Sequence, residues 1–114
     1  MVYELYQVRL TENDSLLINS VGWDKAQELS SKIKAYATTF MGKNIEKAWA
    51  TGEYEKVAEI EATDLENAFD VGNIGPETQI KRYLSMRSMS VGDVLKDTEG
   101  KFYAVEPIGF KEIK

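Results

Sequence analysis

Ser90-Val91-Gly92-Asp93-Val94-Leu95 is followed, five residues later, by Lys101-Phe102-Tyr103-Ala104-Val105-Glu106. Both segments are rich in β-branched and aromatic residues, which favour extended structure. The residues between them are polar and end in Gly100, which accepts the left-handed geometry that such turns require. The two segments therefore predict an antiparallel hairpin. After a bend at Pro107, residues 109 to 113 resume an extended path.

Two further strands are expected earlier in the chain. Residues 2 to 10 place apolar side chains on both faces, which is typical of a central strand. Residues 54 to 62 alternate, with Ala58 and Ile60 on an inner face and glutamates on an outer, solvated face that also includes Val57. Together with the hairpin, these strands predict a small antiparallel sheet.

Helices are expected between the strands. Apolar residues recur at three- and four-residue spacing from Asp24 to Phe40, and Gly42 supplies a C-terminal cap. Four shorter helical segments complete the pattern: one or two turns after Thr11, a short helix containing Trp49, a helix capped near Asp64 and a helical turn over residues 77 to 84. We expect one α+β domain over residues 1–114, with the Asp24–Phe40 helix packed on one face of the sheet. No linker or internal repeat is evident.

The composition restricts the chemistry that the chain can perform. Its 114 residues contain neither cysteine nor histidine. These absences exclude disulfides, thiolate nucleophiles, zinc–sulfur sites and mechanisms that require imidazole. The N-terminus lacks a secretory pattern and the apolar stretches are too short to span a bilayer, so we expect a cytoplasmic protein without membrane contact. No catalytic residue, cofactor or metal ligand is predicted.

The formal net charge of −5 is unevenly distributed, because residues 53 to 79 carry a net charge of −7 and the rest of the chain is net positive. An acidic strand face attracts a basic partner, but exposed ion pairs add little affinity, so an aromatic anchor is also expected. The predicted partner-binding residues are Trp49, Tyr54, Glu55, Glu59 and Glu61. A solubilising surface, or a carboxylate site for a metal-dependent hydrolase, is the alternative interpretation of the same carboxylates.

The C-terminal third mixes basic and aromatic residues, which could contact a nucleic-acid strand by stacking and phosphate binding. The residues of this alternative are Lys81, Arg82, Tyr83, Arg87 and Tyr103. Because the chain is acidic and these residues do not form a dense basic cluster, a nucleic-acid partner is not the preferred interpretation.

Three segments resemble the YodL-like domain family. They are Tyr3-Glu4-Leu5-Tyr6-Gln7-Val8, then Asp64-Leu65-Glu66-Asn67-Ala68-Phe69 with Asn73, and finally Arg87-Ser88-Met89-Ser90-Val91-Gly92-Asp93-Val94 with Phe102-Tyr103-Ala104-Val105 and Gly109-Phe110. The family occurs in bacteria, conjugative elements and phages, and the chain is also similar to small proteins of cyanobacterial phages. Where the family has an acidic residue and a serine before the final Gly-Phe pair, this chain has Glu106-Pro107-Ile108.

The resemblance implies an accessory protein of a phage or mobile element, and it supplies no catalytic residues. With the composition, it predicts a non-enzymatic protein that binds a host or phage protein. Exposed strand edges and aromatic residues also suggest a homodimer.

Overall fold

Six antiparallel strands form one sheet in the computed structural model, which describes residues 1–113. In spatial order they are β3 (Ile80–Arg82), β2 (Glu55–Glu61), β1 (Val2–Gln7), β4 (Val94–Lys96), β5 (Phe102–Val105) and β6 (Phe110–Ile113). The α+β class, the central first strand and the C-terminal hairpin are thereby confirmed. The hairpin pairs Val94 with Ala104 and Leu95 with Tyr103.

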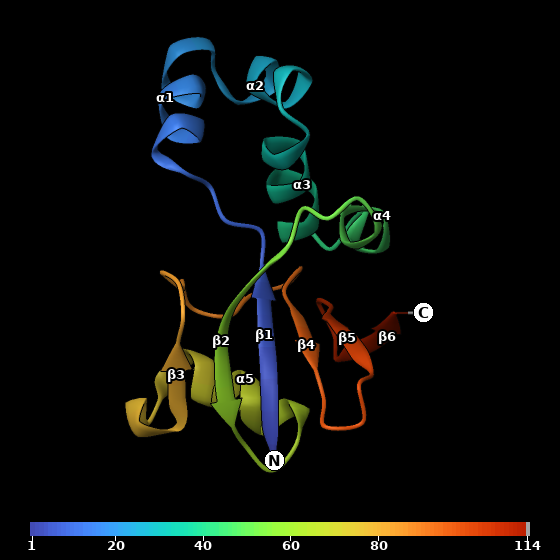
Figure 1. The fold of residues 1–114 in the computed structure, drawn as a ribbon. Helices are drawn as coiled ribbons and strands as arrows, with labels where there is room; N and C mark the ends of the chain where they lie inside the picture. Colours follow the sequence, from blue (N-terminus) through green and yellow to red (C-terminus); the bar gives the residue numbers. More distant parts are fainter. Residues whose placement is uncertain (114) are drawn as a thin grey trace.

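Helix α5 (Leu65–Ile74) lies along one face of the sheet (Figure 1), where its apolar side chains contribute to the main core. Tyr3 and Leu5 of β1 lie opposite Ile60 and Ala58 of β2, so the four side chains share this face. They pack with Ala68 and other apolar residues of α5. Asp64 caps the helix by accepting a hydrogen bond from the Asn67 amide, which confirms the cap expected near Asp64.

A second apolar cluster lies on the other face, where α4 (Ile45–Ala50) covers the strands. It joins Ile45 of the helix to Val94, Ala104 and Ile113 of the sheet. Four partly buried aromatic rings complete it: Tyr6, Trp49, Tyr54 and Phe102. The aromatic side chains therefore cover this face of the sheet where its strands approach the helices.

The helical arm, which we define as α1 (Glu12–Val21), α2 (Trp23–Leu29) and α3 (Ser31–Phe40), extends beyond the end of β1 (Figure 1). Thr11 and Asp14 form the capping box that starts α1. The expected single helix from Asp24 to Phe40 is wrong, because Ser30 has extended backbone and its side chain accepts a hydrogen bond from the Ile33 amide. This serine is an N-cap, so it ends one helix and begins the next. In the described part of the chain, no helix is long and apolar enough to cross a membrane.

Two local expectations also need correction. Residues 77 to 84 are not a helical turn throughout, because a short 3-10 turn at Glu77–Gln79 leads into β3, which pairs with β2. Val57 does not lie on the solvated face of β2 but is fully buried. The register shifts by one residue beside it, since Leu5 lies opposite Ala58 while Tyr6 lies opposite Lys56. Such a β-bulge turns the following side chains and breaks strict alternation.

Candidate functional site

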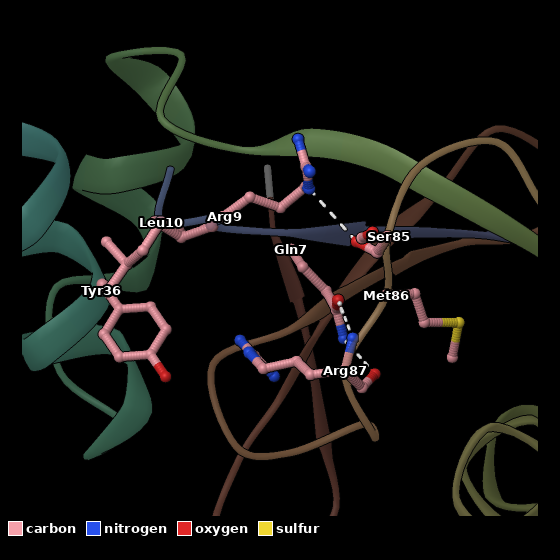
Figure 2. A pocket seen from close by; sticks show the side chains of 8 residues that line it. Gln7, Arg9, Leu10, Tyr36, Ser85, Met86 and Arg87 are labelled. Carbon is pink, nitrogen blue, oxygen red and sulfur yellow. Dashed lines mark hydrogen bonds between the residues drawn. The ribbon is translucent and has the colours of Figure 1, made fainter. Parts of the chain in front are cut away.

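A pocket of about 350 Å³ opens where the helical arm meets the sheet, and we call it the junction pocket. Figure 2 shows Tyr36 of α3 on one side and the segment of Ser85, Met86 and Arg87 on the other. The end of β1 and the residues after it, including Arg9 and Leu10, form the rest of the wall. Apolar side chains and two guanidinium groups thus border one cavity, which is the usual composition of a ligand or partner pocket.

The arginines of the junction pocket are held by carboxylates. Arg9 donates from Nη1 to Glu55 Oε2 at 3.1 Å and from Nε to the Ser85 carbonyl at 3.1 Å. Arg87 donates from Nη2 to Asp93 Oδ1 at 2.9 Å. The Arg9 and Arg87 side chains are 28% and 31% exposed, whereas Asp93 has no exposed surface. The part of the Arg87–Asp93 pair that reaches solvent is therefore positively charged.

A buried hydrogen-bonded network lies beneath the pocket and consists of Gln7, Arg87 and Asp93. Gln7 Nε2 donates to Asp93 Oδ2 at 3.0 Å and to the Arg87 carbonyl at 3.1 Å, while Gln7 Oε1 accepts from the Arg87 amide at 3.3 Å. The Ser90 amide also donates to Asp93. Burial raises the pKa of the Asp93 carboxyl above its ordinary value, although Arg87 and these donors oppose the change. The network fixes the loop that carries Arg87.

Beside the pocket, three ring systems stack in an aromatic row formed by Trp23, Tyr36 and Phe40. The Tyr36 ring centroid lies 6.2 Å from that of Trp23 and 6.4 Å from that of Phe40, with interplanar angles of 18° and 14°. The guanidinium carbon of Arg87 lies 5.7 Å from the Tyr36 centroid. Trp23 and Phe40 are 47% and 54% exposed, so the row presents aromatic surface to solvent at the edge of the pocket.

The two aromatic residues predicted as partner anchors lie elsewhere. Trp49 packs against Tyr6, Tyr54 and Phe102, with centroid distances of 5.1, 5.4 and 4.8 Å. The hydroxyl of Tyr54 donates a hydrogen bond to the Gly92 carbonyl, and burial raises the pKa of this phenol. These contacts give both side chains a packing role within the domain. Their predicted contact with a partner stays a prediction.

The glutamates of the predicted acidic face form ion pairs within the chain. Glu55 lies within ion-pair distance of Arg9 and Lys32. Glu59 pairs with Lys56 at 2.9 Å and accepts a hydrogen bond from Tyr83, and Glu61 lies 3.5 Å from the N-terminal amine. The hydrogen bond from Lys56 lowers the pKa of Glu59 below its ordinary value. Lys56 of the same strand and three cations from other segments therefore offset the local excess of glutamates.

The residues of the nucleic-acid alternative are dispersed. Lys81 and Tyr83 lie close together, with the ammonium 5.2 Å from the ring centroid. Arg82 is paired with Glu77, and Arg87 belongs to the junction pocket. Tyr103 lies on the sheet face that carries Leu95, beside Tyr3 and Asp64. The structure does not bring these five side chains into one basic surface.

The carboxylates considered for a metal-dependent hydrolase also remain apart. Among residues 1–113, no three acidic side chains form a group that could hold a metal ion. The arrangement of these carboxylates therefore gives the hydrolase alternative no support.

Sequence reasoning missed the aromatic row and the junction pocket. Tyr36 and Phe40 are four residues apart on one helix, and this spacing places them on the same helix face. This spacing alone does not reveal the site, because Trp23 and Arg9 come from separate segments that meet Tyr36 or its pocket only in the folded chain.

Comparison with known proteins adds no relative: no protein-family model, no curated protein and no solved structure matches the chain. The resemblance to the YodL-like domain family accordingly stays a prediction.

Proposed function

We propose that this chain is a non-enzymatic binding protein whose partner protein docks on the aromatic row and the junction pocket. The observation that carries the proposal is the exposed stacking of Trp23 and Phe40 against Tyr36 at the mouth of the pocket. Exposed aromatic rings beside a partly apolar pocket are typical of the centre of a protein interface. The missing cysteine and histidine agree with a binding role.

The helical arm supports the same surface. Helix α1 buries none of its residues, and isolated helices of about ten residues are marginal in water. The arm also exposes several large apolar side chains: Leu16, Val21, Trp23, Leu29 and Phe40. A partner that covers this surface would remove apolar area from water and stabilise the helices.

The exposed charge specifies the chemistry of the partner. Because the Arg87 side chain is partly exposed while its partner Asp93 is fully buried, the pocket favours a segment that brings a carboxylate beside an apolar side chain. With the family resemblance, this points to a host or phage protein and to an accessory role in a phage or mobile element.

The experiment compares two double variants. Trp23→Ala/Phe40→Ala removes the exposed ends of the aromatic row, and Ile74→Ala/Ile108→Ala removes two exposed apolar side chains elsewhere. The immobilised proteins are exposed to a cyanobacterial lysate, and a retained protein is purified and titrated by calorimetry. We expect the first variant to weaken binding at least about tenfold, since interface aromatics often contribute over 1.4 kcal/mol each, and the second to bind as the unchanged protein does. Equal binding by both variants would contradict the proposal.

A single-stranded nucleic acid is the second candidate, because stacked aromatic rings next to arginine also suit unpaired bases. Its distinguishing test is a fluorescence titration with a labelled oligonucleotide at several salt concentrations. We expect no binding, since the chain carries a net charge of −5 and the five residues of the nucleic-acid alternative do not form one basic surface. Binding that weakens steeply with salt and is lost in Trp23→Ala/Phe40→Ala would favour this candidate instead.

A homodimer is a separate proposal. Strands β3 and β6 are the two edges of the sheet, and edge strands offer unpaired backbone groups to a second copy. Light scattering over a range of concentrations tests it, and a monomeric mass at the highest concentration would reject it.

A further inference from the structure

Helices α3 and α4 share a short pattern of sequence. Residues 34 to 38 read Lys-Ala-Tyr-Ala-Thr, and residues 47 to 51 read Lys-Ala-Trp-Ala-Thr. A polar residue precedes each lysine by three positions, Ser31 in one case and Asn44 in the other. The pattern is too short to mark a structural repeat, since repeat architectures have periods of about 20 to 50 residues.

The two copies have the same local structure. Thr38 Oγ1 donates to the Lys34 carbonyl at 2.9 Å, and Thr51 Oγ1 donates to the Lys47 carbonyl at 3.0 Å. The first alanine of each copy, Ala35 or Ala48, is buried. The side chains at spacings of three, four and seven residues therefore lie on one face of each helix.

These two faces meet across a cavity of about 380 Å³, which we call the paired-helix groove. Lys34 and Lys47, Ala35 and Ala48, and Thr38 and Thr51 all line it, so each copy contributes the same side chains. Ser31, Asn44 and Glu53 complete the described lining. None of these residues lines the junction pocket, so the groove is a different surface from the proposed partner site.

The charge of the groove is mainly positive. Neither Lys34 nor Lys47 forms an ion pair with any residue of the described chain. Glu53 is the acidic residue among the described lining residues, and its Oε1 accepts a hydrogen bond from Ser31 Oγ at 3.0 Å. Two lysines without an ion-pair partner in the described chain thus line a cavity that also has buried alanines in its lining.

We propose that the paired-helix groove binds a small organic anion, a phosphate monoester or a carboxylate with an apolar body. The apolar body would lie against Ala35 and Ala48, while the anionic group would be placed between Lys34 and Lys47. The cavity volume suits a ligand of this size, and lysine is a common ligand for phosphate and carboxylate groups. The inference does not depend on the proposed partner surface.

Phenyl phosphate and benzoate are the probes, titrated into the ¹⁵N-labelled protein and followed by amide chemical shifts. We expect a dissociation constant in the millimolar range and shifts concentrated in residues 31–38 and 44–51, since ligands of about ten heavy atoms bind weakly. Lys34→Gln and Lys47→Gln should each weaken phenyl phosphate binding about threefold to fivefold, and Glu53→Gln should strengthen it. A response to phenyl phosphate alone would assign the groove to phosphate monoesters, and a response to benzoate alone to carboxylates.

Lys43→Gln is the matched control, because Lys43 is exposed in the connection between the two helices and does not line the groove. Its affinity for either probe should be unchanged. Benzyl alcohol, which has the ring without the charge, should bind much more weakly. If Lys43→Gln weakened probe binding as much as the groove variants do, the attraction would come from general positive charge. If benzyl alcohol bound as well as the anions, the groove would be merely apolar. If neither probe shifted any amide signal up to about 20 mM, there would be no site. Each of these results would overturn the proposal.

Discussion

The Arg87 guanidinium binds the Asp93 carboxylate through both terminal nitrogens, with Nη2 2.9 Å from Oδ1 and Nη1 3.3 Å from Oδ2. Asp93 is fully buried immediately before β4, and Arg87 lies on the segment that forms one wall of the junction pocket. Gln7 of β1 donates to the same carboxylate. The pair therefore connects the pocket wall to the central strand of the sheet.

Arg87→Met should lower the free energy of unfolding by about 3 kcal/mol, because it leaves a buried carboxylate without its counter-charge. The partial exposure of Arg87 places the expected loss at the lower end of the range for buried pairs. Urea denaturation followed by tryptophan fluorescence measures it.

The control for this change is the double variant Arg87→Met/Asp93→Asn, which removes both charges. It should regain part of the lost stability, since the amide of asparagine has a much smaller cost of burial than a carboxylate. The unfolding free energies of the double variant and of Arg87→Met are then compared. If they differ by as much as Asp93→Asn costs in the otherwise unchanged protein, the two side chains act independently.

The Asp93 carboxyl should titrate above its ordinary pKa of 3.8, because burial disfavours the charged form more than Arg87 favours it. A raised folded-state pKa means that the folded protein binds this proton more tightly than the unfolded chain. The resulting stabilisation is complete below pH 3.8 and is lost as the pH rises through the folded-state pKa. Carboxyl ¹³C chemical shifts measure the titration, and a midpoint at or below 3.8 would show that pairing outweighs burial.

Gly92→Ala should destabilise the domain by at least about 2 kcal/mol, since its left-handed backbone disfavours a side chain and the new methyl would clash. Gly92 has a φ of 94°, and a Cβ there would lie 2.2 Å from the Thr39 carbonyl oxygen of α3. Thermal unfolding provides the measurement. Gly100→Ala is the control, because Gly100 has a φ of 85° but open space around it, and it should cost only about 1 kcal/mol.

The sequence predicted the sheet where strand patterns were long or strongly apolar. The first strand, expected over residues 2 to 10 and found at Val2–Gln7, and the hairpin around Gly100 were predicted because their side-chain types leave few alternatives to extended structure. Strand β3 was missed because its three residues are too few to show periodicity. The bulge at Val57 could not be predicted either, since it depends on the register with β1.

The candidate site was less predictable than the fold. One partner of Asp93 is local, since the Ser90 amide three residues away donates to it. Its partners Gln7 and Arg87 belong to distant segments, so the buried network follows from the sheet order and not from local pattern. The glutamates of residues 53 to 61 looked unpaired in the sequence. Several of their ion-pair partners, Arg9, Lys32 and the N-terminal amine, come from distant parts of the chain.

The two tryptophans should respond differently to truncation. Trp49→Ala should lower the free energy of unfolding by about 3 kcal/mol, because the ring packs against three other aromatic rings over the sheet. Trp23→Ala should cost less than about 1 kcal/mol, since that ring is 47% exposed and stacks on Tyr36 alone among the described aromatic residues. Urea denaturation followed by far-UV circular dichroism compares both variants without relying on the deleted fluorophore. If Trp49→Ala kept full stability and lost the partner, the anchor predicted from the sequence would be correct and the aromatic row would lose its proposed role.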